Sequence, residues 1–188
     1  MTPHIKPTGI YASQSEINEC VESIILKTGW GDTNQIGLKK RNSIIGDDWF
    51  DSTGRLYDRK TNTFRAKEEE FSLFNGIPDV LLEQLQLLEK KENFVSGRIR
   101  IMKLMPKTGL TVHSDLETRY HYVVKTNDKS YMCFNDIDHS DSDCRAACYH
   151  IPQDQQWYFC DTTKTHWVYN GGDSDRIHIV VNVAKKLS

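Results

Sequence analysis

Two short segments of the sequence carry side chains that are typical metal ligands. His113 and Asp115 stand two positions apart in a His-Ser-Asp tripeptide, and His166 follows well downstream. On extended chain, residues two positions apart point to the same face, so both side chains can reach one ion. Two histidines and one carboxylate form the facial ligand set of non-haem Fe(II) centres, which leaves coordination positions open. The pattern predicts a metal site at His113, Asp115 and His166.

A candidate partner for this site is Arg176, which follows His166 at the head of an apolar, alternating segment. The planar guanidinium of arginine can bind a carboxylate through two parallel hydrogen bonds. We therefore expect Arg176 to bind a dicarboxylate co-substrate beside the metal. We assign no catalytic residue beyond the metal ligands, because in such centres the cofactor performs the difficult step and the protein supplies position.

The elements that must position these residues are predicted to be strands, from about residue 93 onward. Short segments alternate in polarity and are separated by turn residues, as at 126–128 and 170–173. With one more strand from the first region there would be about eight, the count typical of a double-sheet jelly roll. The predicted strands are 98–105, 119–125, 130–134, 147–151, 156–160, 166–169 and 176–184.

The region before residue 93 is predicted to be helical and irregular. Ser13 and Ser15 can cap a helix over 16–27, where apolar residues recur at helical spacing. A second helix is expected from Pro78 to Lys91, with proline in its first turn and lysines at its end. Residues 47–62 are rich in Gly, Asp and Asn and predict loops. We expect one domain over 1–188, in which 1–92 packs on a β-barrel core formed by 93–188.

The bulk composition sets limits on partners and compartment. The 188 residues have a net charge of −2, so no overall positive field favours nucleic-acid binding. No apolar run approaches the ~18 residues of a membrane span, and no segment resembles a signal peptide. The odd count of five cysteines, Cys20, Cys133, Cys144, Cys148 and Cys160, predicts reduced thiols. We therefore expect a cytoplasmic protein, in the host cytoplasm if the source is viral.

The sequence also resembles a known family, the aspartyl/asparaginyl β-hydroxylases. The resemblance covers residues 95–184 well and extends weakly upstream to Gln35-Ile36-Gly37-Leu38 and Asp48-Trp49. At the place where some family members bind the co-substrate through a hydroxyl group, this chain has Ile101, Met102 and Lys103. The segments that carry the resemblance are GRIRIMKLMP (97–106), HSD (113–115), RYH (119–121), HWVYN (166–170) and RIHIVV (176–181).

The resemblance implies a mainly β fold with flanking helices, the double-stranded β-helix or cupin-like jelly roll. It implies an Fe(II)-dependent dioxygenase that uses 2-oxoglutarate and O₂ to hydroxylate an Asp or Asn side chain of a protein or peptide, or a free amino acid. By position, His113, Asp115 and His166 would bind iron and Arg176 the distal carboxylate of 2-oxoglutarate. Arg119 and His121 would hold the other end of that co-substrate.

Several alternatives stay open at the level of sequence. Alternation cannot tell whether the polar face of a strand meets water or a polar barrel interior, and we interpret His178 as structural. A non-catalytic barrel with a structural metal, or a cupin-like enzyme that does not use 2-oxoglutarate, would present the same three ligands. The segment that contains His139, Cys144, Cys148 and His150 could bind zinc, although a solvated acidic loop fits it better.

Overall fold

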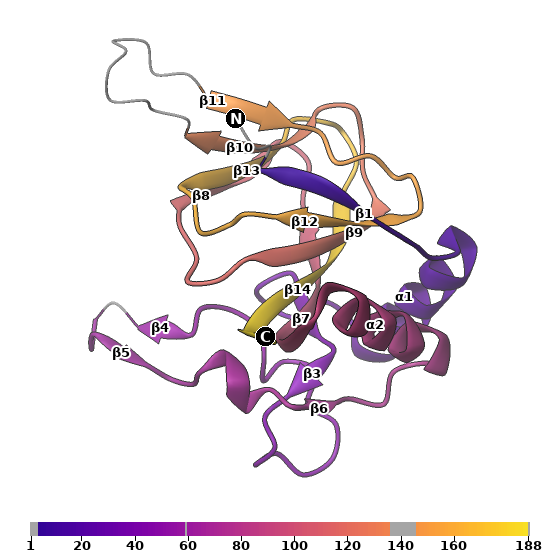
Figure 1. The fold of residues 1–188 in the computed structure, drawn as a ribbon, viewed down its shortest axis with the longest axis vertical. Coiled ribbons are helices and arrows are strands. Elements are labelled where there is room, and N and C mark those ends of the chain that lie inside the picture. The colour runs from indigo at the N-terminus through magenta and orange to yellow at the C-terminus, as the bar shows by residue number, and fades with distance from the viewer. Residues whose placement is uncertain (1–3, 59, 136–145, 188) are drawn as a thin grey trace.

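The computed structural model describes residues 4–58, 60–135 and 146–187. Within these residues, antiparallel strands form two facing sheets (Figure 1). The larger sheet has six strands in the order β1-β12-β9-β14-β7-β2, and the smaller has four in the order β11-β10-β13-β8. Apart from β10 and β11, the neighbouring strands of both sheets are not consecutive in sequence, as expected for a jelly roll. The predicted fold class is confirmed.

The strands of the predicted barrel match expectation closely, but three further strands join the two sheets. These are β1 and β2 from the first region, where one strand was expected without a position, and β8, which ends at the candidate ligand His113. Elements of the first half are β1 (Ile5–Tyr11), α1 (Gln14–Thr28), β2 (Gln35–Gly37), β3 (Lys39–Lys40), β4 (Tyr57–Asp58), β5 (Thr63–Phe64), the 3-10 helix η1 (Glu68–Glu70), β6 (Leu73–Phe74) and α2 (Asp79–Glu92). Elements of the second half are β7 (Phe94–Leu104), β8 (Thr108–His113), β9 (Arg119–Lys125), β10 (Ser130–Asn135), β11 (Ala146–Tyr149), β12 (Gln156–Cys160), β13 (His166–Asn170) and β14 (Arg176–Lys186).

Both predicted helices are present, each with local signals that begin and end it. The Ser13 side chain accepts a hydrogen bond from the backbone N–H of Glu16, and Gly29 ends α1 at a φ of 67°. Helix α2 begins after Pro78 and ends at Asn93, whose backbone is left-handed. Neither helix is long and apolar enough to cross a membrane, and no other helix in the described part of the chain is either.

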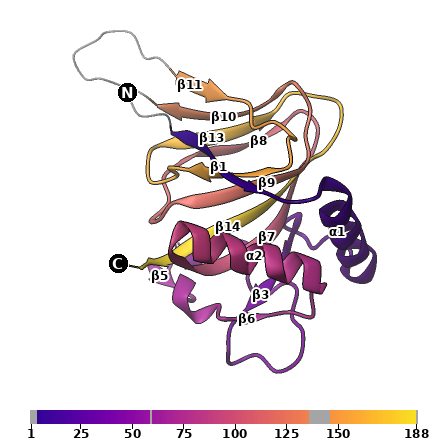
Figure 2. The ribbon, with the colours of Figure 1, turned by 45° about the vertical axis from the view of Figure 1, so that its right-hand side comes forward.

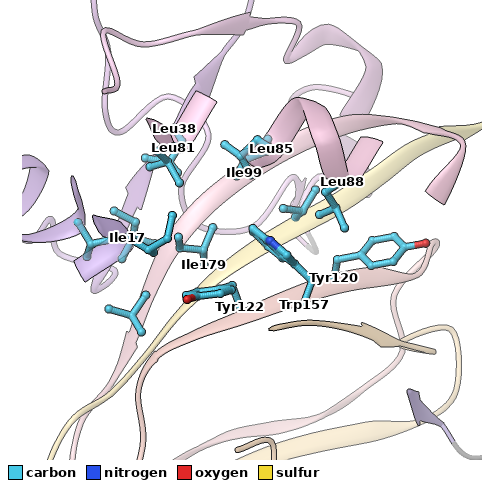
Figure 3. Close-up of a cluster of buried hydrophobic side chains, with 14 of the residues drawn as sticks. Ile17, Leu38, Leu81, Leu85, Leu88, Ile99, Tyr120, Tyr122, Trp157 and Ile179 are labelled. Atoms are coloured by element: carbon cyan, nitrogen blue, oxygen red, sulfur yellow. The ribbon is translucent and has the colours of Figure 1, made fainter. Parts of the chain in front are cut away.

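The helices cover one face of the six-stranded sheet, which we call the outer face (Figure 2). Buried side chains of α1 and α2 pack there against alternate residues of β7, β9, β12 and β14. Figure 3 shows this cluster, with Trp157 and Tyr122 at its centre and Leu81, Leu85 and Leu88 above them. At ~25 cal/mol for each Å² of apolar surface buried, such packing is the main source of stability for the fold.

The opposite face of the six-stranded sheet, the inner face, turns toward the four-stranded sheet. Part of the space between the sheets holds a second apolar cluster, which includes Val123, Met132, Phe134 and Val168. Other inner positions of β7, β9 and β14 carry arginine, histidine and asparagine side chains, most of which are also buried. The polar faces predicted from alternation therefore lie inside the barrel and not in solvent.

The cysteines differ from expectation. Cys133 on β10 and Cys148 on β11 occupy directly opposed positions and form a disulfide, while Cys20 and Cys160 are free and buried. The prediction of reduced thiols is therefore wrong for this pair, because count and compartment carry no information about which strands become neighbours. In the disulfide, Cys148 has no thiolate with which to bind zinc in the alternative site. The other candidate ligands His139 and Cys144 lie outside the described residues.

Candidate metal centre

The two histidines of the predicted metal site come together across two paired strands. His113 is the last residue of β8 and His166 the first of β13, and these residues are directly opposed in the antiparallel ladder. Their ring centroids lie 4.4 Å apart. His166 is almost completely buried, whereas His113 is partly exposed. The site therefore lies at the edge of the barrel, with one ligand inside and one near the surface.

Asp115 completes the cluster from the loop that follows β8. A hydrogen bond from its backbone N–H to the Thr162 carbonyl, 2.9 Å long, holds this loop against the segment before β13. One ligand atom from each of His113, Asp115 and His166 lies within 4.8 Å of the other two. The strand ends at His113, so a loop and not a continued strand brings Asp115 to the site.

Backbone contacts orient both imidazole rings. Nδ1 of His113 lies 2.6 Å from the Thr111 carbonyl oxygen, and Nδ1 of His166 lies 2.8 Å from that of Lys164. Because a carbonyl only accepts, each Nδ1 carries the proton and each Nε2 keeps its lone pair. Burial lowers the pKa of His166, although its bond to Lys164 opposes this, and a neutral imidazole is the form that binds metals.

The free atoms of the cluster face one another in an arrangement that fits a cation. Nε2 of His166 lies 3.6 Å from Oδ2 of Asp115, and Nε2 of His113 lies 3.9 Å from Oδ1. Oδ2 is buried and receives no hydrogen bond from any described residue. Two imidazole lone pairs directed at a carboxylate repel it unless a positive ion lies between them. This donor set, two nitrogens and one oxygen, suits Fe(II).

Arg119 contacts the metal site in a way that the sequence did not indicate. Its Nη2 donates a hydrogen bond of 2.5 Å to Oδ1 of Asp115, so the two form an ion pair four residues apart. The resemblance assigns Arg119 to the co-substrate, and here its guanidinium also holds the carboxylate of a candidate ligand. Its Nε is buried and has no hydrogen-bond partner among the described residues.

Arg176 begins β14 on the inner face, directly opposite Leu104 of β7. Only 6% of its surface is exposed, and no described residue forms an ion pair with it. Burial lowers the pKa of Arg176 to about 10, which still leaves the guanidinium charged at neutral pH. A buried charge without a counter-ion is costly, so this position is suited to an anionic ligand.

His121 and His178 form a buried pair beside Arg176. Their Nδ1 atoms are 3.4 Å apart and their rings are nearly perpendicular, with centroids 5.7 Å apart. Burial first, and then the charge of Arg176, lowers the pKa of both well below the usual value, so both are neutral. Each Nε2 is buried without a partner in the described part of the chain. His178, which we interpreted as structural, lies in the same polar interior.

A further buried polar network lies on the inner face near this site, and sequence reasoning did not identify it. Glu68 of η1 bonds to Arg98 of β7 and to Asn182 of β14, and Asn182 accepts a hydrogen bond from Arg100. The alternation of Arg98 and Arg100 with Ile99 and Ile101 was a usable signal for the two arginines. Glu68 carried no such signal, because it lies in an irregular segment far away in the sequence.

The comparison with protein families agrees with the resemblance. Residues 77–186, more than half of the chain, match the family described as aspartyl/asparaginyl beta-hydroxylase. No curated protein sequence matches the chain significantly.

Similarity to solved structures extends over most of the chain but is low in sequence. AviO1 from Streptomyces viridochromogenes matches 96% of this chain and 89% of its own, with a TM-score of 0.57 and 14% identity. A 2OG-Fe(II) oxygenase family oxidoreductase from Burkholderia pseudomallei matches over 60% of this chain, with a TM-score of 0.46 and 11% identity. That match spans 61% of the Burkholderia chain, less than two thirds of its length. At such identities, the likeness to AviO1 shows the fold alone.

Proposed function

Because the chain belongs to the aspartyl/asparaginyl β-hydroxylase family, we propose that it is an Fe(II)- and 2-oxoglutarate-dependent oxygenase whose metal is held by His113, Asp115 and His166. The observation that carries the proposal is the convergence of three ligand atoms within 4.8 Å, with both imidazole Nε2 atoms free. With Fe(II), 2-oxoglutarate and O₂ bound, the site would convert a C–H bond to C–OH and 2-oxoglutarate to succinate and CO₂.

The residues of the inner face would bind the co-substrate. Arg176 offers a buried, unpaired guanidinium, which suits the distal carboxylate of 2-oxoglutarate. The unpartnered Nε of Arg119 and the imidazole of His121 are the candidate donors for its other end. The neutral His121 can donate one N–H without adding charge, while the hydrogen bond from Arg119 orients Asp115 in the metal site. These groups bind and orient, and none of them has to transfer a proton to the oxidised carbon.

The substrate would be an amino-acid unit, either an Asp or Asn side chain of a protein or peptide, or a free amino acid. The family supports this class. Oxidation of a C–H bond places few demands on the protein other than position and exclusion of water. The partly exposed His113 at the barrel edge leaves the metal position open to a substrate from outside.

The direct test is release of succinate by the purified protein with Fe(II), 2-oxoglutarate and O₂. We expect slow turnover without substrate and faster turnover with peptides or amino acids that gain one oxygen atom in mass. Omission of Fe(II), or use of Asp115→Ala, should abolish both. Stable binding of Zn(II) that is indifferent to 2-oxoglutarate, with no succinate under any condition, would refute the proposal and favour a non-catalytic barrel.

A further inference from the structure

Ion pairs account for most, but not all, of the charge on the inner face. Glu68 accepts hydrogen bonds from the backbone N–H and Nε of Arg98, and Asp115 accepts one from Arg119. Under the proposed function, the distal carboxylate of 2-oxoglutarate pairs with Arg176. The metal and the co-substrate carry opposite charges of equal size, so the net charge of the inner face stays positive, with four arginines against two carboxylates. Among the described residues, Arg100 is the inner-face guanidinium that is left without a carboxylate partner.

Arg100 is held in place by neutral groups alone. Its Nη1 donates to the side-chain oxygen of Gln35 at 3.1 Å and its Nη2 to that of Asn182 at 3.0 Å. Its Nε is buried and has no hydrogen-bond partner among the described residues, and only 3% of the residue is exposed. Burial, followed by the charges of Arg98 and Arg119, lowers the pKa of Arg100 well below the usual value, although the charges of Glu68 and Asp115 oppose this.

The position of Arg100 connects it to the metal centre. Asn182, which accepts its hydrogen bond, is directly opposed to Arg119 on the neighbouring strand β9. Arg119 in turn holds Asp115. Arg100 and His121 occupy the inner positions on either side of Val180, on the two strands that flank β14. The guanidinium of Arg100 therefore lies on the inner face next to β14, which carries Arg176, and one strand removed from Arg119 and His121 on β9.

Neutral partners satisfy hydrogen bonds, but they offset the cost of a desolvated charge less than a directly bonded carboxylate would, and the carboxylates of Glu68 and Asp115 are already bonded to Arg98 and Arg119. A bound carboxylate would remove that cost and would also find the free Nε–H. An amide could accept the hydrogen bond but would leave the charge unbalanced. The local chemistry therefore discriminates between an acid and its amide.

We propose that Arg100 forms a subsite for a carboxylate of the substrate, so that the substrate is an acid and not the corresponding amide. The inference rests on the proposed function, because it takes the substrate to be an amino-acid unit. The carboxylate can come from the side chain of an acidic residue or from the main chain of a free amino acid. Either source presents the same group to Arg100.

The test measures thermal stabilisation of the protein loaded with Zn(II) and N-oxalylglycine, an inert analogue of 2-oxoglutarate. Three probes are added at equal ionic strength. N-acetyl-L-aspartate amide carries only a side-chain carboxylate, N-acetyl-L-asparagine amide carries none, and N-acetyl-L-asparagine carries only a main-chain carboxylate. We expect at least one carboxylate probe to raise the Tm and the uncharged probe to have no effect. The effective carboxylate probe identifies the source.

Two variants assign the effect to Arg100. Arg100→Gln should weaken binding of the effective probe by at least ~10-fold, since charge-assisted hydrogen bonds contribute more than one power of ten. Gln35→Glu would place a carboxylate on Arg100 without removal of any charged group. It should raise the Tm of the protein without probe and lower the probe affinity. If Arg100→Gln does not fold, Gln35→Glu decides the matter.

A matched control is Lys103→Gln, which removes a positive charge from the same strand. The Lys103 amine lies over the ring of Trp30, 4.6 Å from its centroid, away from the inner-face residues. This variant should bind the probe as the wild type does. Equal stabilisation by acid and amide, no carboxylate-dependent shift, or full probe affinity in Gln35→Glu would overturn the inference.

Failure of the proposed function is recognised separately. In that case N-oxalylglycine would not raise the Tm above that of the protein with Zn(II) alone. The three probes are then compared on the protein without N-oxalylglycine, where Arg100 has the same neutral partners and the same expectation applies.

Discussion

The two faces of the six-stranded sheet are built from the same strands but have opposite chemistry. On β14, Ile179 and Val181 point to the helices, while Arg176, His178 and Asn182 point into the barrel. Both sets are buried, so the difference is not one between interior and solvent. The outer face is packed with apolar side chains, whereas the inner face combines an apolar cluster with charged and polar groups, several of which have buried atoms without a hydrogen-bond partner among the described residues.

This difference indicates that one face of the sheet stabilises the fold and the other binds ligands. Apolar packing on the outer face stabilises the fold, because burial of hydrocarbon surface is favourable without any ligand. The unpaired polar atoms of the inner face are unfavourable for folding and are suited to binding. Substitutions on the inner face should therefore change binding more than stability, and those on the outer face should do the reverse.

The largest effect is expected from His166→Ala, which removes the buried metal ligand on β13 of the four-stranded sheet. Loss of one of three ligands should abolish iron binding and reduce succinate formation by roughly 100-fold or more. The domain should remain folded, because the outer-face core does not involve the metal. Metal content after dialysis, succinate release and the circular dichroism spectrum measure the three outcomes.

The matched control is His150→Ala, which removes a histidine whose Nδ1 lies 2.9 Å from the Ser130 carbonyl. It should retain the metal and turnover. An unfolded His166→Ala would contradict the view that the outer-face core is stable without the metal, and would indicate a structural metal. Loss of metal in His150→Ala would instead revive the zinc site that the disulfide argues against.

Arg176→Ala should have the next largest effect, on co-substrate binding. Removal of one partner of a buried charge pair costs about 2–5 kcal/mol, which corresponds to a Kd for 2-oxoglutarate raised at least ~30-fold. Titration of N-oxalylglycine into the Zn(II)-loaded protein by calorimetry measures this directly. Lys185→Ala, at an exposed position of the same strand, is the control and should bind normally. An unchanged Kd in Arg176→Ala would favour an enzyme that does not use 2-oxoglutarate.

The periodicity of the sequence predicts much of the difference between the two faces of the sheet. The alternation of Arg119 and His121 with Tyr120 and Tyr122 correctly separates the side chains of the two faces. Helix α1 was predictable because its cap and its apolar spacing are local signals. The convergence of the three candidate ligands was predictable from residue type and spacing, together with the family resemblance.

The remainder depends on contacts between segments distant in sequence, for which periodicity carries no signal. Whether a polar face meets solvent depends on the second sheet that covers it. The disulfide depends on the register of β10 and β11, and the ion pair of Glu68 with Arg98 depends on where an irregular segment docks. Strand β1 was missed because Pro7 and Gly9 obscure its pattern, although it pairs with β12 at the edge of the sheet.

On the outer face, Leu85→Ala should lower the free energy of unfolding by about 3 kcal/mol, because it leaves a cavity in the packed cluster of α2. The Kd for N-oxalylglycine should not change. Leu87→Ala removes the same group from the same helix, where the side chain is 36% exposed, and should cost much less. Urea denaturation measures both. A weaker co-substrate affinity in Leu85→Ala would show that the two faces are not independent.

The smallest expected effect concerns the pH dependence of stability and sharpens the view of the inner face. Burial holds the pKa of His178 well below that of an exposed histidine, about 6.5, and Arg176, His121 and His150 add to the shift. Below pH ~6.5 the unfolded chain therefore binds a proton at this residue that the folded protein does not. Stability should fall with decreasing pH by about 1.4 kcal/mol per unit for this residue, and it is fully regained above pH ~6.5.

His178→Gln removes this contribution, so urea denaturation of the metal-free protein at pH 7 and pH 5.5 should show a smaller loss of stability in the variant. Equal losses in both proteins would mean that His178 is protonated in the folded protein, and the inner face would then hold more charge than its neutral histidine pair suggests.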